Sequence, residues 1–228
     1  MIHFYCVYKT GGDFSPEYVN RLAGAIHNFC SLKHKVVCLT DYKEKLNVDI
    51  VVPLKHNWEG WWSKIELFRN DLPGKIGVYF DLDTVINGNL NKIVKLAYRI
   101  SFGMLRGFNP RIPNIYASGV MAGDFKKFAY LYEIFKVCPE QWIQNTIKRA
   151  NQREQKAGLQ GDQGYIGYII NLDEVIFLQD LLPPNYITGK RHTKKAIVVP
   201  KSSIIAWTGK PRLHNQNSPL SKIWRRYE

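Results

Sequence analysis

Residues 76–84 read Ile-Gly-Val-Tyr-Phe-Asp-Leu-Asp-Thr, a short apolar run followed by two aspartates with one leucine between them. The run 75–80 predicts a buried strand that ends at Asp81. In an extended chain residues i and i+2 share a face, so Asp81 and Asp83 can both point toward one cation. Ligands of open α/β sheets gather at the carboxyl ends of strands. Carboxylate oxygens suit the hard ions Mg²⁺ and Mn²⁺, with phosphate oxygens in the remaining positions. The stretch therefore predicts a divalent-metal site, against the alternative of a solvated turn.

Strand and helix patterns alternate on both sides of this stretch. Apolar runs predict strands at 2–8, 35–40, 49–53, 101–106, 118–122, 175–178 and 196–199. Helical spacing, with Ser15 as cap and Pro16 in the first turn of the first helix, predicts helices at 15–29, 60–68, 125–138, 141–156 and 163–170. The alternation indicates an α/β fold with a mostly parallel central sheet. We expect one domain over residues 1–213 and a basic, aromatic C-terminal tail over 214–228.

Charge is concentrated near the C-terminus. The chain of 228 residues has a formal net charge of +13, and residues 181–228 hold ten Lys or Arg against the single acid Glu228. Such a segment suggests a polyanionic partner, either nucleic acid, an anionic membrane surface or a phosphorylated glycan. The alternative is solubility together with binding of one small anionic substrate. With 45% hydrophobic residues the chain has enough apolar surface for a folded core.

The chain has four cysteines without CxxC spacing, which argues against a zinc knuckle or a redox motif and fits a reducing compartment. The N-terminus shows no signal-peptide pattern. No apolar run reaches the roughly 18 residues that span a bilayer. We expect a cytoplasmic protein, with possible peripheral contact to an anionic membrane.

Four segments in order resemble those of GT-A-type glycosyltransferases, the glycogenin-like and related bacterial and viral members. Val7-Tyr8-Lys9-Thr10 resembles the segment that cups the nucleobase, and 62–68 resembles the helix whose lysine reaches the donor phosphates. Phe80-Asp81-Leu82-Asp83 resembles the family's DxD motif, and Gly161-Asp162-Gln163 resembles its Asp-Gln pair near the transferred sugar. Together they span residues 2–170.

The resemblance implies a single GT-A (Rossmann-like) domain, a nucleotide-sugar donor, with UDP-sugars favoured, and Mn²⁺ or Mg²⁺ as cofactor. The donor-binding residues that it and the strand-end positions suggest are Val7, Tyr8, Thr10, Asp41, Lys64, Asp81 and Lys210. The catalytic candidates are Asp162, Gln163 and Lys64. The acceptor candidates, chosen from the resemblance and from the basic segment, are Ser118, Gly119, Arg191, Lys194 and Lys195.

The chain departs from the family pattern in two places. Asn-Ser-Gly is replaced by Ala117-Ser118-Gly119, which removes an expected contact of the asparagine with the sugar. The family's metal-binding histidine near the C-terminus is replaced by Ala206. His214 is the substitute that we predict as the third metal ligand with Asp81 and Asp83, and a water or the diphosphate is the alternative.

Several functions stay open on these grounds. The favoured one is a metal-dependent hexosyl- or pentosyltransferase acting on a polyanion such as hydroxymethylated DNA, whose target base would be flipped out of the duplex. A second acceptor is a lipopolysaccharide-type glycan at the membrane, since the tail 222–227 mixes basic and aromatic residues. From other classes, paired aspartates also serve nucleotidyl or phosphoryl transfer, although no Gly-rich phosphate loop is present. A non-catalytic nucleic-acid-binding module has no recognition motif in its support. Donor sugar, nucleobase, stereochemistry and oligomeric state are left open.

Overall fold

The computed structural model describes residues 1–228 except 109–114, 151–158, 171, 192–200, 209 and 228. Its strands are β1 (Ile2–Tyr8), β2 (His34–Thr40), β3 (Ile50–Pro53), β4 (Ile76–Phe80), β5 (Thr84–Ile86), β6 (Phe102–Arg106), β7 (Tyr116–Asp124), β8 (Ile176–Phe177), β9 (Ile187–Arg191) and β10 (Ile204–Thr208). Its α-helices are α1 (Pro16–Phe29), α2 (Asn91–Ala97), α3 (Ala129–Val137), α4 (Pro139–Arg149), α6 (Asp162–Ile169), α7 (Leu178–Leu181) and α8 (Pro219–Trp224). Short 3₁₀ helices are η1 (Gly60–Phe68), η2 (Phe125–Phe128), η3 (Leu172–Glu174) and η4 (Leu213–Asn215).

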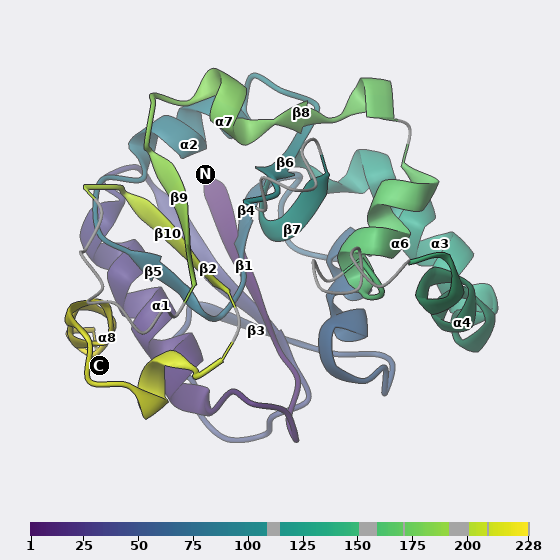
Figure 1. The fold of residues 1–228 in the computed structure, drawn as a ribbon, viewed down its shortest axis with the longest axis horizontal. Coiled ribbons are helices and arrows are strands. Elements are labelled where there is room, and N and C mark those ends of the chain that lie inside the picture. Colours follow the sequence, from purple (N-terminus) through teal and green to yellow (C-terminus); the bar gives the residue numbers. More distant parts are fainter. Residues whose placement is uncertain (109–114, 151–158, 171, 192–200, 209, 228) are drawn as a thin grey trace.

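The central sheet has the strand order β3-β2-β1-β4-β7-β6-β8 (Figure 1). β3, β2, β1 and β4 run parallel to one another, and β6 and β8 form a second parallel pair. β7 runs antiparallel to both β4 and β6. The sheet is thus mostly parallel, as the alternation of strands and helices predicts. Because β1, β2 and β4 point the same way, their carboxyl ends and the loops that follow meet at one edge.

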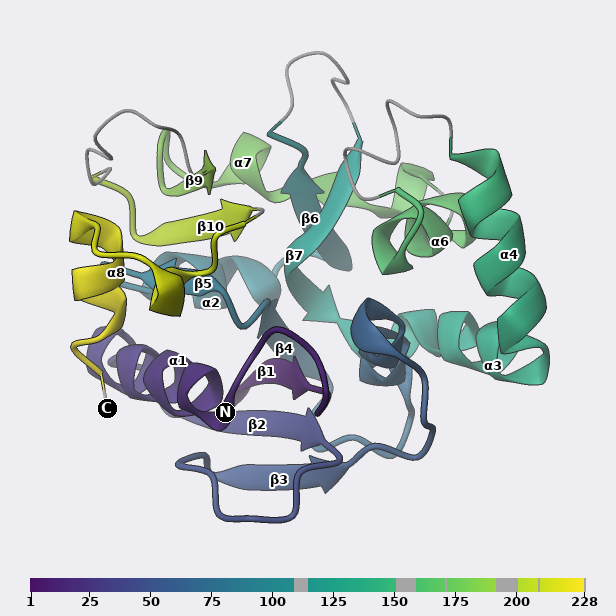
Figure 2. The ribbon, with the colours of Figure 1, turned by 60° about the horizontal axis from the view of Figure 1, so that its bottom comes forward.

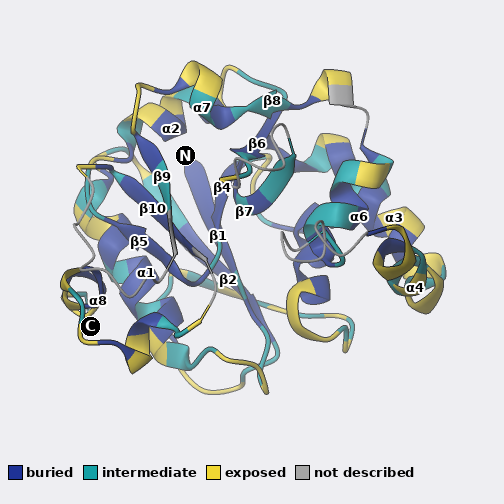
Figure 3. Ribbon diagram, in the orientation of Figure 1, coloured by how far each residue is buried: buried dark blue, intermediate teal, exposed yellow. Residues whose placement is uncertain are grey.

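The central strands are buried on both faces, which explains their nearly continuous apolar sequences (Figure 3). Along β1, Phe4 and Cys6 face one core and Tyr5 faces the other. The first core packs against α1, α2 and a small sheet of order β5-β10-β9, and the second against η1, α3 and α6 (Figure 2). The two faces together form a three-layered α/β domain.

Most predicted elements are present, with shifted boundaries. The helix predicted at 60–68 is a 3₁₀ helix, and the strand predicted at 175–178 divides into the two-residue β8 and the start of α7. The helix predicted at 141–156 begins earlier, at Pro139, and ends at Arg149, and residues 151–156 of the prediction include none that the structure describes. The strand predicted at 196–199 lies outside the described residues. The sequence patterns gave no prediction for β5, β9, β10, α2 or α8.

The small sheet brings the C-terminal part of the chain to the site. β10 pairs antiparallel with β5, with Ala206 opposite Thr84, and parallel with β9. The chain that leaves β10 therefore passes beside the turn that carries Asp81 and Asp83. This connection exists because β5 follows that turn directly and stays buried along its whole length.

Residues 214–228, which the sequence suggested as a tail, include the packed helix α8. Leu220 and Trp224 are buried, and the Trp224 ring lies 4.4 Å from that of Tyr18 in α1. A capping box at Ser218 and Ser221 begins the helix. Up to Trp224 the segment thus belongs to the folded domain. Within the described part of the chain, no helix is long and apolar enough to cross a membrane.

Candidate functional site

The two aspartates lie in a tight turn at the end of β4. The Asp81 backbone N–H donates to the Gly119 carbonyl of β7 at 2.9 Å, and the Thr84 N–H donates to the Asp81 carbonyl at 2.9 Å. Leu82 is buried between the two acids and anchors the turn in the core. Asp81 is half-buried and Asp83 is buried. The apolar residue between the carboxylates thus fixes the turn that presents both of them.

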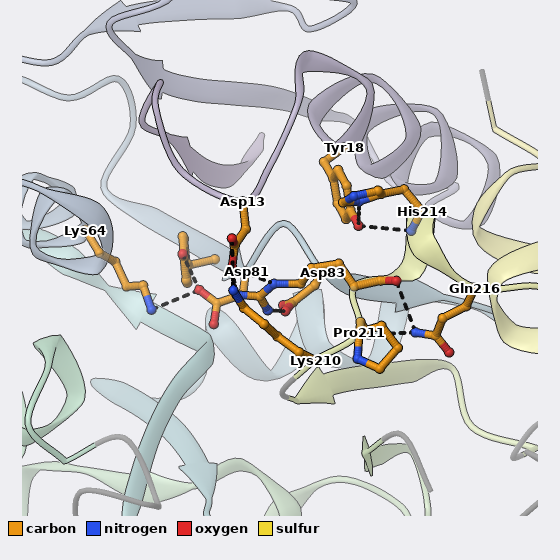
Figure 4. A network of polar contacts seen from close by, with 11 residues as sticks. Asp13, Tyr18, Lys64, Asp81, Asp83, Lys210, Pro211, His214 and Gln216 are labelled. Atoms are coloured by element: carbon orange, nitrogen blue, oxygen red, sulfur yellow. Dashed lines mark hydrogen bonds and ion pairs between the residues drawn. The ribbon is translucent and has the colours of Figure 1, made fainter. Parts of the chain in front are cut away.

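Lys64 of η1 is the centre of a buried polar cluster beside this turn, and Figure 4 shows its contact with Asp81. Its Nζ lies 2.9 Å from Asp81 Oδ1 and 3.0 Å from Asp162 Oδ2, and it donates to Ser118 Oγ at 3.0 Å. Ser118 Oγ in turn donates to Asp162 Oδ2 at 2.5 Å. The Tyr79 hydroxyl donates to Asp81 Oδ1 at 2.6 Å. The cluster joins η1, β4, β7 and the first turn of α6, so it links residues far apart in sequence.

Burial shapes the charges of this cluster. Burial lowers the pKa of Lys64, but the carboxylates of Asp162 and Asp81 outweigh it and hold that pKa well above its usual value. The pKa of Asp162 is raised, because burial disfavours its charged form more than Lys64 favours it. Burial and the neighbouring Asp81 also raise the pKa of Tyr79. Lys64 is therefore a permanent buried cation, and one lysine faces two carboxylates.

A second polar cluster joins Asp83 to the C-terminal segment. Arg212 Nη1 donates to Asp83 Oδ2 at 2.7 Å, and the same guanidinium reaches Asp13 Oδ2 at 3.2 Å. Lys210 Nζ donates to Asp13 Oδ1 at 3.2 Å. Burial, reinforced by the charge of Asp81, raises the pKa of Asp83 to about 7 despite Arg212. The pKa of Asp13 is lowered, chiefly by its hydrogen bond from Lys210.

The loop after β1 is held by Asp41, which follows β2. Asp41 accepts from Thr10 N and Thr10 Oγ1, both at 2.9 Å, and from Lys9 Nζ. Burial acts to raise the pKa of Asp41, but these hydrogen bonds more than offset it, so the pKa is lowered. Tyr8 is buried against Tyr42, with ring centroids 5.6 Å apart, and Val7 is half-buried on the opposite face. The predicted donor residues of this region are thus adjacent, with Asp41 shaping the loop.

His214 lies in η4 and is exposed. Its Nδ1 is 2.8 Å from the Tyr18 hydroxyl, which also accepts from the His214 backbone N–H at 3.2 Å. Among the residues that the structure describes, no three His, Cys, Asp or Glu side chains are close enough together to hold a metal ion. His214 therefore does not join Asp81 and Asp83 in this arrangement, because its ring is turned to Tyr18 instead.

The two aspartates still fit a divalent cation. Mg²⁺ is commonly held by one or two carboxylates, with substrate phosphates and water as the other ligands. Asp83 already pairs with a cationic group, the Arg212 guanidinium, in the described structure. A donor set of two aspartates at the sheet edge thus suits a metal that arrives together with a phosphorylated substrate.

The predicted acceptor residues are divided. Ser118 is buried within the Lys64 cluster, and Gly119 lies so close to the turn that an added Cβ would be 3.3 Å from Asp81 Oδ2. Arg191 ends β9, while Lys194 and Lys195 lie outside the described residues. Gln163, half-buried, lines a cavity of about 320 Å³ between α4 and α6. The structure brings Ser118 and Gly119 to the aspartates and gives Gln163 a neighbouring position.

Sequence reasoning missed three residues of the site: Tyr79, Asp13 and Arg212. Tyr79 had a readable signal, because it precedes Asp81 by two residues and shares its face. Arg212 follows Lys210 by two residues, so the two cations could have been considered together. Its pairing with Asp83, across 129 positions of sequence, had no such signal.

No protein-family model matches the sequence, and no curated protein does. Solved structures do match. GlyE, a glycosyltransferase of Streptococcus pneumoniae, has a TM-score of 0.69 at 12% identity, covering 100% of this chain and 60% of GlyE. The galactosyltransferase LgtC, solved with donor and acceptor sugar analogues, has a TM-score of 0.63 at 12% identity, covering 99% of this chain and 94% of LgtC. The bifunctional glycosyltransferase WbbM has a TM-score of 0.60 at 12% identity, covering 99% of this chain and 51% of WbbM.

This chain thus spans about 60% of GlyE and about half of WbbM, but nearly all of LgtC. The three neighbours are all glycosyltransferases, and each match includes essentially every residue of this chain. Together with the mostly parallel sheet and its antiparallel β7, these matches establish that the chain has the GT-A glycosyltransferase fold.

Proposed function

We propose that this chain is a metal-dependent glycosyltransferase that transfers a sugar from a nucleotide-sugar donor. The observation that carries the proposal is the cluster of Lys64, Asp81, Asp162 and Ser118 at the carboxyl edge of the sheet. It combines two carboxylates with a buried cation next to a third carboxylate, Asp83. A phosphorylated, polyhydroxylated substrate needs such an alternation of donors and acceptors.

The chemistry needs stabilisation of a departing diphosphate. Breaking the bond to the sugar carbon leaves negative charge on the diphosphate and positive charge on the sugar ring. A divalent cation held by Asp81 and Asp83 would supply Lewis-acid stabilisation of the leaving group. Lys210 and Arg212 would bind the phosphates, and their contacts with Asp13 in the loop after β1 support this role.

Asp162 is the residue that we assign to the sugar. Its carboxylate is buried, and Lys64 and Ser118 fix one oxygen at 3.0 and 2.5 Å. A carboxylate held in this way orients sugar hydroxyls and stabilises positive charge developing on the ring. Lys64 acts as the positioning partner of both Asp81 and Asp162. The resemblance to glycogenin favours a reaction that retains the stereochemistry of the sugar carbon.

For the acceptor we propose a sugar hydroxyl, as LgtC was solved with an acceptor sugar analogue. Of the basic C-terminal residues, Lys210, Arg212 and Arg225 form contacts inside the chain, which leaves fewer cations for a nucleic acid. Modified DNA is the alternative acceptor, and the net charge of +13 favours it. Binding of a duplex oligonucleotide at two salt concentrations separates the two acceptors. Strong, salt-sensitive binding supports DNA, and its absence at low salt removes DNA.

The donor reaction can be tested without knowledge of the acceptor. The purified chain is incubated with Mn²⁺ or Mg²⁺ and a panel of nucleotide sugars, and slow release of nucleoside diphosphate is measured. We expect release from at least one donor, loss on chelation, and a decrease of at least about 100-fold in Asp83→Asn. Exposed Asp173 provides the matched control, Asp173→Asn. No release from any donor, or equal rates in Asp83→Asn and the wild type, would refute the proposal.

A further inference from the structure

Arg212 lies in a segment whose backbone is anchored and whose side chain reaches the metal-binding turn. Gln216 Nε2 donates to the carbonyls of Pro211 at 2.8 Å and Arg212 at 3.2 Å. Arg225 donates to the carbonyls of His214 at 3.0 Å and Gln216 at 2.8 Å. The close-up shows this segment beside Asp83 and Asp13 (Figure 4). Fixed backbone around a long side chain allows the guanidinium to change partners without moving the fold.

The guanidinium is bound by two carboxylates from different loops. Its Nη1 lies 2.7 Å from Asp83 Oδ2, while Nε and Nη2 lie 3.3 and 3.2 Å from Asp13 Oδ2. Its Cζ lies 4.6 Å from the centre of the Phe14 ring. Asp83 is 9% exposed and Arg212 21% exposed in their side chains, so the pair is shielded from bulk water. Together with Lys210, this local group has two acids and two bases and is electrically neutral.

This neutrality decides what the group can bind. A divalent cation that arrives alone must displace Arg212 from Asp83 and then faces two released cations. A diphosphate that arrives alone gives Arg212 a new partner but leaves Asp83 buried without its cation, which is costly. When both arrive, the metal takes Asp83 and the phosphate oxygens take Arg212 and Lys210. Asp83, Arg212 and Lys210 then all have partners, because a guanidinium matches phosphate oxygens as well as it matches carboxylates. Asp13 loses both of its basic partners, but its side chain is 40% exposed and water can solvate it.

We propose that Arg212 is a donor-diphosphate ligand that exchanges Asp83 and Asp13 for the phosphates, and that this exchange makes metal and nucleotide bind cooperatively. The inference rests on the proposed function, because it concerns the same donor site. The DxD motif accounts for the metal, and Lys210 of the Lys-Pro sequence accounts for one phosphate contact. Neither accounts for a cation that leaves Asp83 when the metal and the diphosphate bind, which is the role that we assign to Arg212. By linkage, the nucleotide strengthens metal binding by the same factor by which the metal strengthens nucleotide binding.

The test measures binding rather than turnover. Calorimetry gives the affinity for Mn²⁺ alone, for UDP alone and for UDP at saturating Mn²⁺, and spin resonance of free Mn²⁺ checks the first value. In the wild type we expect Mn²⁺ to strengthen UDP binding by about tenfold or more. In Arg212→Gln we expect tighter binding of Mn²⁺ alone and at least about tenfold weaker binding of UDP with Mn²⁺. Arg212→Lys keeps the positive charge but loses the planar pair of N–H donors, so its affinities should lie between those of the wild type and those of Arg212→Gln.

Two further variants sharpen the test. Arg106 forms a similar pair with a different carboxylate and ring, 2.6 Å from Asp180 with its Cζ 4.1 Å from the Phe177 ring, so Arg106→Gln is the matched control and should leave all three affinities unchanged. Asp13→Asn removes one carboxylate competitor and should strengthen UDP binding. Thermal unfolding of each variant confirms that it is folded.

The outcomes separate the two proposals. If the wild type binds UDP with Mn²⁺ but Arg212→Gln has unchanged affinities, the exchange is refuted and the donor site stands. If Arg212→Gln weakens Mn²⁺ and UDP alike, the arginine only supports the turn, and the exchange is again refuted. If the wild type binds none of a panel of nucleoside diphosphates, both the proposed function and the exchange fail. Opposite changes in the two affinities support the exchange.

Discussion

At the scale of single residues, Lys64 is the group on which the site depends most. Its side chain is 8% exposed and lies within 3.0 Å of two carboxylates. Lys64→Met removes the only cation of the described cluster and leaves Asp81 and Asp162 facing each other. We expect the free energy of unfolding to fall by about 3–5 kcal/mol, because breaking a buried ion pair leaves uncompensated charge. Urea unfolding measures the change.

The control for this prediction is Lys92→Met, a change of the same kind on the exposed surface of α2. It should alter the free energy of unfolding by no more than about 0.5 kcal/mol. Equal, small effects of the two substitutions would mean that Lys64 is not buried between the carboxylates.

Asp162 gives a pH dependence with a definite sign. Its pKa is higher in the folded than in the unfolded chain, so the folded protein binds this proton more tightly. As pH rises from the unfolded pKa through the folded pKa, the contribution of Asp162 to stability therefore decreases. Asp162→Asn removes this dependence. At pH 7 we expect the free energy of unfolding of the variant to be at least equal to that of the wild type. Between pH 7 and pH 4 the wild type should gain stability relative to the variant, because only the wild type can protonate Asp162.

Urea unfolding of both proteins between pH 4 and pH 8 measures the difference in slope. Carboxylates elsewhere whose pKa is lowered, such as Asp41, contribute equally to the stability curves of both proteins. Their contributions therefore cancel in the difference between the two curves. Donor hydrolysis should be lost in Asp162→Asn although the fold is retained. Parallel stability curves would show that the carboxylate is not destabilised by burial.

The residue scale also shows what sequence can reveal. Asp81 and Asp83 were predictable, because an apolar strand followed by acids at spacing two is a local pattern. Lys64 and Asp162 came only through a family resemblance, since nothing local distinguishes them from a solvated lysine or a helix cap. The pairing of Arg212 with Asp83 could not be found, because it depends on how β10 returns to β5.

At the scale of elements, α6 positions Asp162, and its glycines have different surroundings. A Cβ at Gly164 would lie 1.8 Å from the Leu159 carbonyl oxygen, a backbone atom that cannot swing away. A Cβ at Gly167 would meet nothing within 4 Å. We therefore expect Gly164→Ala to destabilise the chain by about 1–3 kcal/mol and to lower donor hydrolysis by displacing Asp162.

Gly167→Ala is the matched control on the same helix. Alanine is favoured over glycine in helices, so this variant should be more stable by about 0.5–1 kcal/mol and keep its donor hydrolysis. Thermal or urea unfolding of the two variants checks both directions. Similar effects at the two positions would contradict the close approach of Leu159 to Gly164.

Element prediction succeeded where apolar runs were long enough. β1, β2 and β4 each lie in the middle of the sheet and are buried on both faces, so their sequences are nearly continuous in hydrophobicity. β5 has three residues directly after the Asp81 turn, and β8 has two, which is too short for a periodic signal. The region 60–68 was readable as helical but not as 3₁₀, because this choice depends on tertiary packing around Lys64.

At the scale of the whole molecule, the C-terminal segment, residues 204–227, connects the metal-binding turn to helix α1. It crosses from β10 past Asp83, and α8 then docks on α1. The same segment is one of the most basic parts of the sequence. Among its described cations, Lys210, Arg212 and Arg225 bind groups inside the chain, which explains why net charge alone suggested a polyanionic partner more strongly than the structure does.

Trp224 is the residue through which this connection can be tested. Its ring is 3% exposed, lies 4.4 Å from the Tyr18 ring and receives the Arg21 guanidinium at 4.2 Å. Trp224→Ala should lower the free energy of unfolding by about 3–5 kcal/mol, the usual cost of truncating a buried tryptophan. Since α8 also anchors the segment of Arg212 through Arg225, UDP binding should weaken in the molecules that stay folded.

Trp61 serves as the comparison, because its side chain is 48% exposed and Trp61→Ala should cost only about 0.5 kcal/mol. Urea unfolding followed by circular dichroism gives both values, and calorimetry at a temperature below the transition gives the UDP affinity. If Trp224→Ala unfolds like the wild type, α8 does not hold the C-terminal segment in place. In that case the position of Arg212 at Asp83 must be maintained by Gln216 and Asp13 alone.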